Sequence, residues 1–224
     1  MQKPHHIAIK EFAVNSPEED AKGLFILAHG AGKGMGTSFM EAIATGVVKA
    51  GVSVVRFHFP YMEESLRTGT KISPNGGRVL RRSFSDVISH FIEREKVPCE
   101  HIFIGGKSMG GRVAAMIAEN HQVAGVICLG YPFHPQGKPE RLRIEHLKTI
   151  QTPTLICQGE RDPKGKREEI EQLAFSRAVQ IQWLKDGDNN FKPRKRSGRS
   201  LDENMADAIQ SCNGFITRIL ESRN

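Results

Sequence analysis

The chain has 224 residues, a length that suits one α/β domain able to bury a full core without disulfides or metal ions. We therefore expect a single domain over residues 1–224. The four cysteines are widely spaced and indicate neither a disulfide framework nor a zinc site. The first residues lack the apolar core of a secretion signal, and no apolar run approaches the length of a membrane span. These features predict a soluble, cytoplasmic protein with no membrane partner.

The net charge is +7, from 32 basic and 25 acidic residues. Part of the excess lies in the basic run Lys192–Arg199, which could contact phosphates. No helix-turn-helix, zinc-finger or aromatic-rich basic surface accompanies this run. We therefore favour a solvated loop over a nucleic-acid site, and an acidic small substrate stays open.

Apolar runs typical of strands alternate with segments of helical spacing along the chain. The expected strands are His6–Val14 at an edge, Leu24–His29, Val52–Phe59, His101–Ile104, Val123–Leu129, Thr154–Gln158 and Val179–Leu184. The expected helices are Ser38–Ala50, Arg78–Lys96, Val113–Ala118, Glu140–Lys148, Lys166–Phe175 and Ser200–Ser222. The polar segment Glu63–Gly77 is expected to be a surface loop near the site. This alternation predicts a mostly parallel sheet with helices on both faces and functional loops at the carboxyl ends of the strands.

A serine stands on the sharpest predicted turn, between a short apolar strand and an alanine-rich helix. Gly106, Ser108 and Gly110 fit the pattern Gly-x-Ser-x-Gly. The bare pattern is common by chance and could mark a glycine-rich turn, but the flanking strand and helix favour the nucleophile elbow of an α/β hydrolase. The helix that follows would direct its free N–H groups at negative charge near Ser108 Oγ.

Two further loops should meet the elbow above the sheet. The loop after Leu24–His29 offers the backbone N–H of Ala31, which with that of Met109 would form an oxyanion hole. The loop after Thr154–Gln158 carries Asp162, placed in chain order as a triad acid. The alternatives are a plain strand-end turn at Ala31 and a structural Asp-Pro turn at Asp162.

Several blocks of sequence carry a resemblance that covers nearly the whole chain. These are Leu27–Gly32, Val55–Met62, Gly105–Gly111, Gly130–His134, Gln158–Asp162 and Lys192–Lys195. They resemble a family of predicted bacterial α/β hydrolases that also includes the hydrolase-like domain of a subunit of the non-specific lethal histone acetyltransferase complex. The wider group is similar to dienelactone hydrolases. The resemblance implies an α/β-hydrolase fold without a large lid domain, and neither a cofactor nor a metal is expected.

The resemblance implies a triad of Ser108, Asp162 and a histidine after Gly-Asp, and that last position is Asn189. No histidine follows His146. An asparagine amide can hydrogen-bond but cannot take the serine proton, because it has no usable basicity. The leading hypothesis is therefore a serine hydrolase of small esters or related acyl compounds whose activity is weak or absent.

Two alternatives stay open. One is a non-catalytic module that keeps the pocket for a small ligand or a protein partner. The other is that Asn189 is an introduced change that traps substrate.

Histidines that follow predicted strands are candidates for a substitute base or a substrate contact. They are His29, His58 and His134. Of these, His134 is favoured because it lies on a proline-stiffened segment after the strand next to the elbow. A lone histidine in such a place is more often a packing residue.

Overall fold

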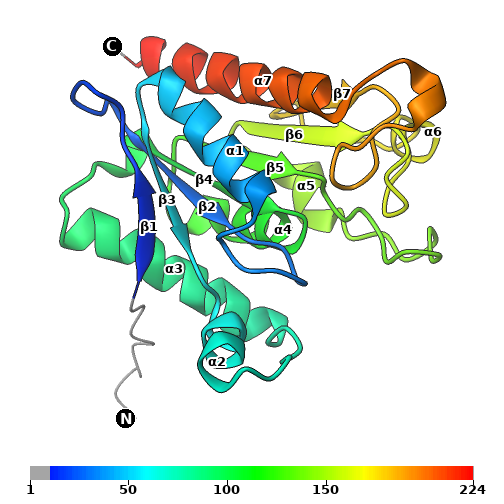
Figure 1. Cartoon of the computed structure of the whole chain (residues 1–224). Coiled ribbons are helices and arrows are strands. Elements are labelled where there is room, and N and C mark those ends of the chain that lie inside the picture. Colours follow the sequence, from blue (N-terminus) through cyan, green and yellow to red (C-terminus); the bar gives the residue numbers. More distant parts are fainter. Residues whose placement is uncertain (1–10, 224) are drawn as a thin grey trace.

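A computed structural model describes residues 11–223, which form one seven-stranded sheet with helices on both faces (Figure 1). The strands are β1 (Phe12–Asn15), β2 (Leu24–Ala28), β3 (Ser53–Phe57), β4 (Ile102–Lys107), β5 (Gly125–Leu129), β6 (Thr154–Gly159) and β7 (Val179–Leu184). The α-helices are α1 (Ser38–Val47), α2 (Pro60–Thr68), α3 (Gly77–Glu93), α4 (Met109–Ile117), α5 (Glu145–Thr149), α6 (Arg167–Ile170) and α7 (Leu201–Glu221). No helix within residues 11–223 combines the length and the apolar character needed to cross a membrane.

The strand order is β1-β3-β2-β4-β5-β6-β7, and only β1 runs antiparallel to its neighbour. The mostly parallel sheet is therefore confirmed. β1 is the predicted edge strand, although the first part of that prediction, 6–10, lies outside the described residues. From β2 the chain crosses to β3 on one side, whereas β4 begins the succession on the other side. The loops after β2 and β4 thus lie beside each other at the switch point, where open α/β sheets bind their ligands.

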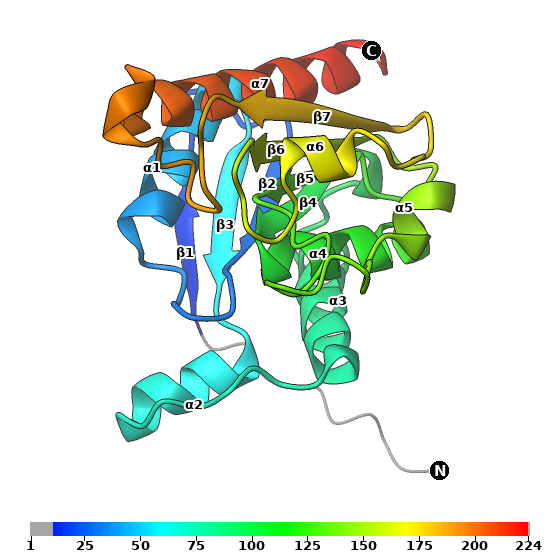
Figure 2. The ribbon, with the colours of Figure 1, turned by 90° about the vertical axis from the view of Figure 1, so that its right-hand side faces the viewer.

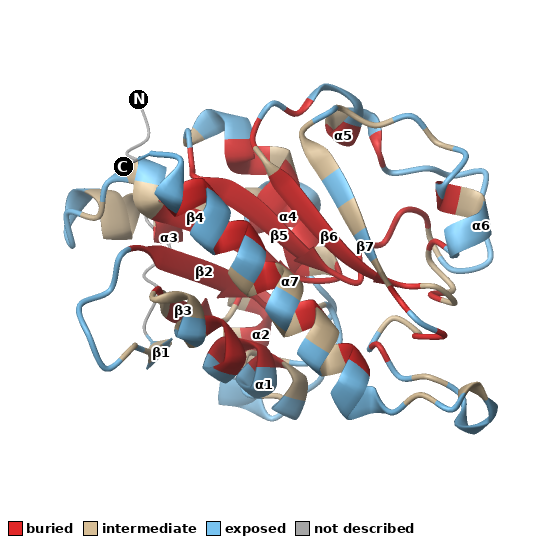
Figure 3. Ribbon diagram, turned by 90° about the horizontal axis from the view of Figure 1, so that it is seen from above, coloured by how far each residue is buried: buried red, intermediate tan, exposed pale blue. Residues whose placement is uncertain are grey.

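The helices cover the sheet in two groups, and each group encloses its own apolar cluster (Figure 1). Helices α1 and α7 pack over one face, while α3 and α4 pack over the other. Every residue of β2, β4, β5 and β6 is buried, as expected for parallel strands covered on both faces. Figure 3 shows α7 lying across these buried strands.

The prediction of a surface loop over Glu63–Gly77 is wrong in its first part, because α2 occupies Pro60–Thr68. Proline at the first helical position has a suitable φ and no amide hydrogen to leave unpaired. Gly69 then ends the helix with a φ of 68°. Only Tyr61 and Met62 are buried on this helix, so the polar composition conceals it. Figure 2 shows α2 projecting from the body of the protein beyond β3.

Two predicted helices are only about half as long in the structure as expected. Helix α5 begins at Glu145 rather than at residue 140, because Arg143 N donates to Phe133 O (2.7 Å) and is not available to a helix. Helix α6 ends at Ile170, and the chain beyond it forms turns, with Leu173 N donating to Ile170 O (3.0 Å). A hydrogen bond to a distant residue thus replaces a helical one in the first segment, and a local turn does so in the second.

Candidate active site

Ser108 occupies a strained turn between β4 and α4. Its φ of 48° and ψ of −108° form a combination that residues with a side chain rarely adopt. Two glycines permit the turn to approach β2, because a Cβ atom on Gly106 or Gly110 would lie only 2.3 or 2.6 Å from Ala28 O. The predicted order of strand, sharp turn and helix is confirmed. The Ser108 side chain stands at the edge of the core, 8% exposed.

The loop after β2 is held by a buried tyrosine. Tyr61 Oη lies 3.2 Å from Gly30 O and 3.0 Å from Ala31 O, and burial raises the pKa of Tyr61 to about 12. The hydroxyl therefore stays protonated at neutral pH and fixes the carbonyl side of the loop. The N–H of Met109 belongs to the first turn of α4, whose N–H groups have no partner inside the helix. The backbone N–H groups of Ala31 and Met109 stay the predicted oxyanion donors.

Asp162 is fully buried after β6 and accepts three hydrogen bonds. The donors are Asn189 Nδ2 (2.6 Å), Gln158 Nε2 (3.0 Å) and Lys164 N (2.9 Å). Burial raises the pKa of the Asp162 carboxyl, and the hydrogen bonds from Asn189 and Lys164 oppose that shift. The carboxylate is thus aimed at Asn189, the residue at the position of the expected histidine.

The amide of Asn189 has a defined orientation. Asp162 Oδ2 accepts a hydrogen bond, so the nitrogen of the amide must face it and the oxygen Oδ1 must face the other way. Asn189 Nδ2 also lies 3.2 Å from Gly130 O. Gly130 has a φ of 69°, and a Cβ atom there would come within 2.6 Å of Asn189 O. Glycine at this turn allows Asn189 to reach the end of β5.

Lys107 is a member of the site that sequence reasoning missed. It is the last residue of β4, directly before Ser108, and is only 8% exposed. Its Nζ donates to Asn189 O (2.6 Å) and Asn189 Oδ1 (2.7 Å) and lies 5.3 Å from the centre of the Phe39 ring. Burial lowers the pKa of the Lys107 ammonium to about 7. The signal in the sequence was a lysine at the end of a central strand, directly before the elbow serine, since lysine is almost never buried without a partner.

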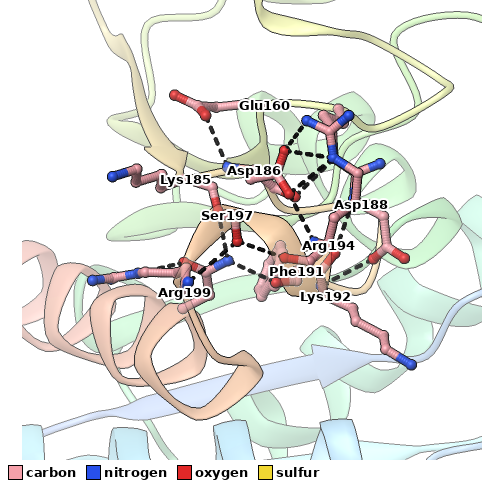
Figure 4. Close-up of polar contacts among 11 residues, drawn as sticks. Glu160, Lys185, Asp186, Asp188, Phe191, Lys192, Arg194, Ser197 and Arg199 are labelled. Carbon is pink, nitrogen blue, oxygen red and sulfur yellow. Dashed lines mark hydrogen bonds and ion pairs between the residues drawn. The ribbon is translucent and has the colours of Figure 1, made fainter.

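The loop that carries Asn189, residues 185–199, is held in place by hydrogen bonds and ion pairs from its own basic run (Figure 4). Arg194 donates through its backbone N and its side chain to Asp186, and these hydrogen bonds hold the pKa of Asp186 well below its usual range. Arg199 donates through Nε to an asparagine of α7 (3.1 Å). Part of the basic run therefore fixes the backbone around Asn189.

Ser108, Lys107 and Asn189 line one pocket of about 600 Å³. Its lining includes Ala31, Phe39, Lys107, Ser108, Lys164 and Asn189. The loops after β2 and β4 thus meet the loop that follows β7 around this pocket. The pocket is large enough for a small organic ligand.

Of the three histidines offered as substitute bases, His58 accepts from Met35 N through Nδ1 (3.4 Å), and the other two have partners at both ring nitrogens. His29 Nδ1 lies 2.7 Å from Gly30 O, and His29 Nε2 accepts from Phe59 N (3.0 Å). Burial lowers the pKa of His29 to about 4, so the ring is neutral at physiological pH. His134 Nδ1 lies 2.9 Å from a backbone carbonyl, and its Nε2 lies 3.2 Å from Glu169 Oε2. Neither His29 nor His134 therefore has a ring nitrogen left to accept the Ser108 proton.

Solved structures of hydrolases share this architecture. An alpha-beta serine hydrolase homologue from Coxiella burnetii is 17% identical, with a TM-score of 0.68 over 92% of this chain and 89% of that one. A serine hydrolase without lid from Xanthomonas campestris is 19% identical, with a TM-score of 0.66 over 90% of this chain and 86% of that one. Est1E from Butyrivibrio proteoclasticus is 14% identical, with a TM-score of 0.70 over 94% of each chain.

These similarities show the α/β-hydrolase fold, and the neighbour without a lid matches the absence of a large insertion between the described strands. A model of the alpha/beta hydrolase domain matches residues 21–217, which include the elbow, Asp162 and Asn189. The chain belongs to the alpha/beta hydrolase domain family.

Proposed function

We propose that the protein is a serine hydrolase of small esters or related acyl compounds, with Ser108 as its nucleophile. The observation that carries this proposal is the strained elbow at Ser108, which opens into the same pocket as Asn189, the partner of Asp162. Strain of this kind persists where the surrounding structure holds it for a function. A solved structure of Est1E contains ferulic acid, so a related fold accommodates a small aromatic acid.

In the proposed reaction, Ser108 Oγ attacks the acyl carbon of a substrate held in the pocket. The negative charge that develops on the carbonyl oxygen would be stabilised by the N–H groups of Ala31 and Met109 and by the N-terminal end of α4. Asp162 does not contact the substrate in this proposal; it accepts a hydrogen bond from Asn189 and so orients that amide in the pocket. Loss of the triad histidine from a serine protease costs about 8 kcal/mol of barrier, so weak turnover is expected at an asparagine site.

A second candidate function is a binding module, and Asn189 is the observation that favours it. An amide in place of the imidazole keeps the hydrogen bond to Asp162 while removing the base. By its sequence blocks the chain would fall in the branch that includes the histone acetyltransferase subunit, and the module would then bind a small ligand or a protein partner. A cytoplasmic location and weak affinity for nucleic acid complete the proposal.

We expect Ser108→Ala to abolish the slow hydrolysis of a nitrophenyl acetate by the purified protein. The reason is that this hydroxyl is the proposed acyl acceptor. Ser211→Ala, on α7, serves as the matched control, because its hydroxyl only donates to a backbone carbonyl of that helix (2.8 Å). Equal turnover by the unmodified protein and a folded Ser108→Ala variant would favour the binding module instead.

A further inference from the structure

A basic nitrogen lies in the same pocket as Ser108 and is hydrogen-bonded to the residue at the position of the expected triad histidine. Asn189 Nδ2 donates to Asp162, which is the hydrogen bond that the Nδ1–H of a triad histidine makes. The amide has no second nitrogen to face the serine. The oxygen of the same amide, Asn189 Oδ1, accepts a hydrogen bond from Lys107 Nζ (2.7 Å). Asp162, Asn189 and Lys107 therefore form one continuous hydrogen-bonded row.

Lys107 and Ser108 leave the elbow on the same side. A Cβ atom placed on Gly30 would lie 3.5 Å from Lys107 Cγ and 3.8 Å from Ser108 Cβ, so both side chains start beside this glycine. Both also line the pocket that contains Asn189. The reversal of the backbone at Ser108 brings together two neighbours that would point to opposite faces of a continuing strand.

We propose that Lys107 is the catalytic base for Ser108, and that Asn189 is a positioning residue that holds the Lys107 amine. This inference rests on the hydrolase function proposed above. It assigns a role to a side chain that the Ser, His, Asp pattern does not use.

The hydrogen bonds of Lys107 suit a base. A neutral amine has two N–H groups and one lone pair. Both N–H groups can donate to Asn189, at O and at Oδ1, which leaves the lone pair free for the Ser108 hydroxyl. Burial lowers the pKa of Lys107 to about 7, so the neutral form is well populated at physiological pH.

Charged groups around Lys107 act in both directions. The carboxylates of Asp162 and Asp188 favour the ammonium form, and the ammonium of Lys164 opposes it. Asp202 of α7 lines the same pocket. The neighbouring side chain of α1 is the uncharged ring of Phe39.

The proposed step conserves protons and electron pairs. The Ser108 Oγ–H proton passes to the lone pair of Lys107 Nζ as Oγ bonds to the acyl carbon, and the carbonyl π pair moves onto the oxygen. The Lys107 ammonium then gives that proton to the leaving-group oxygen as its bond to carbon breaks. Water repeats the sequence on the acyl-enzyme, with its proton taken by Lys107 and returned to Ser108.

The test measures the rate at which a fluorophosphonate labels Ser108, followed by mass spectrometry between pH 5.5 and 9.5. For the unmodified protein we expect the rate to rise about tenfold per pH unit below pH 7 and to level off above it, because only the neutral amine can act. Lys107→Met should lower the plateau about a hundredfold or more and remove the inflection near pH 7. Lys192→Met, an exposed lysine on the loop of Asn189, should leave the profile unchanged.

Two outcomes would overturn the role of Lys107. One is a labelling rate that falls as the pH rises through 7, which would mean that Lys107 acts as the ammonium, stabilising negative charge, and not as a base. The other is unchanged labelling in a folded Lys107→Met protein. The profile of the unmodified protein decides the first outcome even if the variant does not fold. Ester turnover that is independent of Ser108 would instead overturn the proposed function, while the labelling profile would still decide the role of Lys107.

Discussion

Replacing Asn189 by histidine should raise the Ser108-dependent kcat/KM for a nitrophenyl acetate by up to about 10²- to 10⁴-fold, the usual contribution of a positioned general base, and the gain is smaller by the factor that the Lys107 amine already supplies. The acid is already in place, because Asp162 is aimed at the side chain of residue 189 at 2.6 Å. A histidine there could donate Nδ1–H to Asp162 and present Nε2 to Ser108, which fixes the useful tautomer. Lys107 could keep its hydrogen bond to the backbone O of residue 189.

The adjacent asparagine provides a matched control for this experiment. Asn190→His adds the same imidazole to the same pocket, but among the described residues Asn190 makes no hydrogen bond to Asp162, so this variant should give no such gain. The gain of Asn189→His should vanish with Ser108→Ala and fall strongly with Asp162→Asn. No increase in a well-folded Asn189→His protein, together with no Ser108-dependent turnover by the unmodified protein, would mean that the pocket has diverged beyond one substitution, and the binding module would become the better hypothesis.

The fold could be predicted from the sequence where burial is two-sided or periodic. The run Leu24–Ala28 is apolar at every position because helices cover both faces of β2, and this makes the strand visible without a structure. Helix α7 shows both an apolar stripe and a capping serine, Ser200. Helix α2 was missed because it buries only Tyr61 and Met62, so its local pattern resembles a polar loop.

In the candidate site, too, local features could be predicted from the sequence and contacts between distant residues could not. The elbow at Ser108 is a local feature, since the glycines that permit it lie within two residues. The position of Asn189 came from resemblance, and the structure places this residue against Asp162. The contact between Lys107 and Asn189 joins residues 82 positions apart, so no local pattern could indicate it. The role of Lys107 could therefore be inferred only after the structure had shown its contact with Asn189.

The free energy of unfolding should report the buried amine of Lys107 independently of any substrate. Burial lowers the pKa of Lys107 to about 7 in the folded protein, whereas an unfolded lysine titrates near 10.5. Between these values the unfolded chain binds one proton more than the folded chain, so stability rises with pH, by up to about 1.4 kcal/mol per unit. Below pH 7 both states are protonated and the full cost of burying the ammonium is present.

Between pH 7.5 and 9.5 the free energy of unfolding of the unmodified protein should therefore rise by about 2 kcal/mol more than that of Lys107→Met. Urea unfolding at several pH values measures this difference. The change with pH is the quantity to compare, because the substitution also leaves two oxygens of Asn189 without their donor, which shifts the stability at every pH. For Lys192→Met, at an exposed position, the plot of unfolding free energy against pH should run parallel to that of the unmodified protein. Parallel curves for Lys107→Met as well would show that Lys107 titrates as an ordinary lysine, and a base at neutral pH would then have to be sought elsewhere.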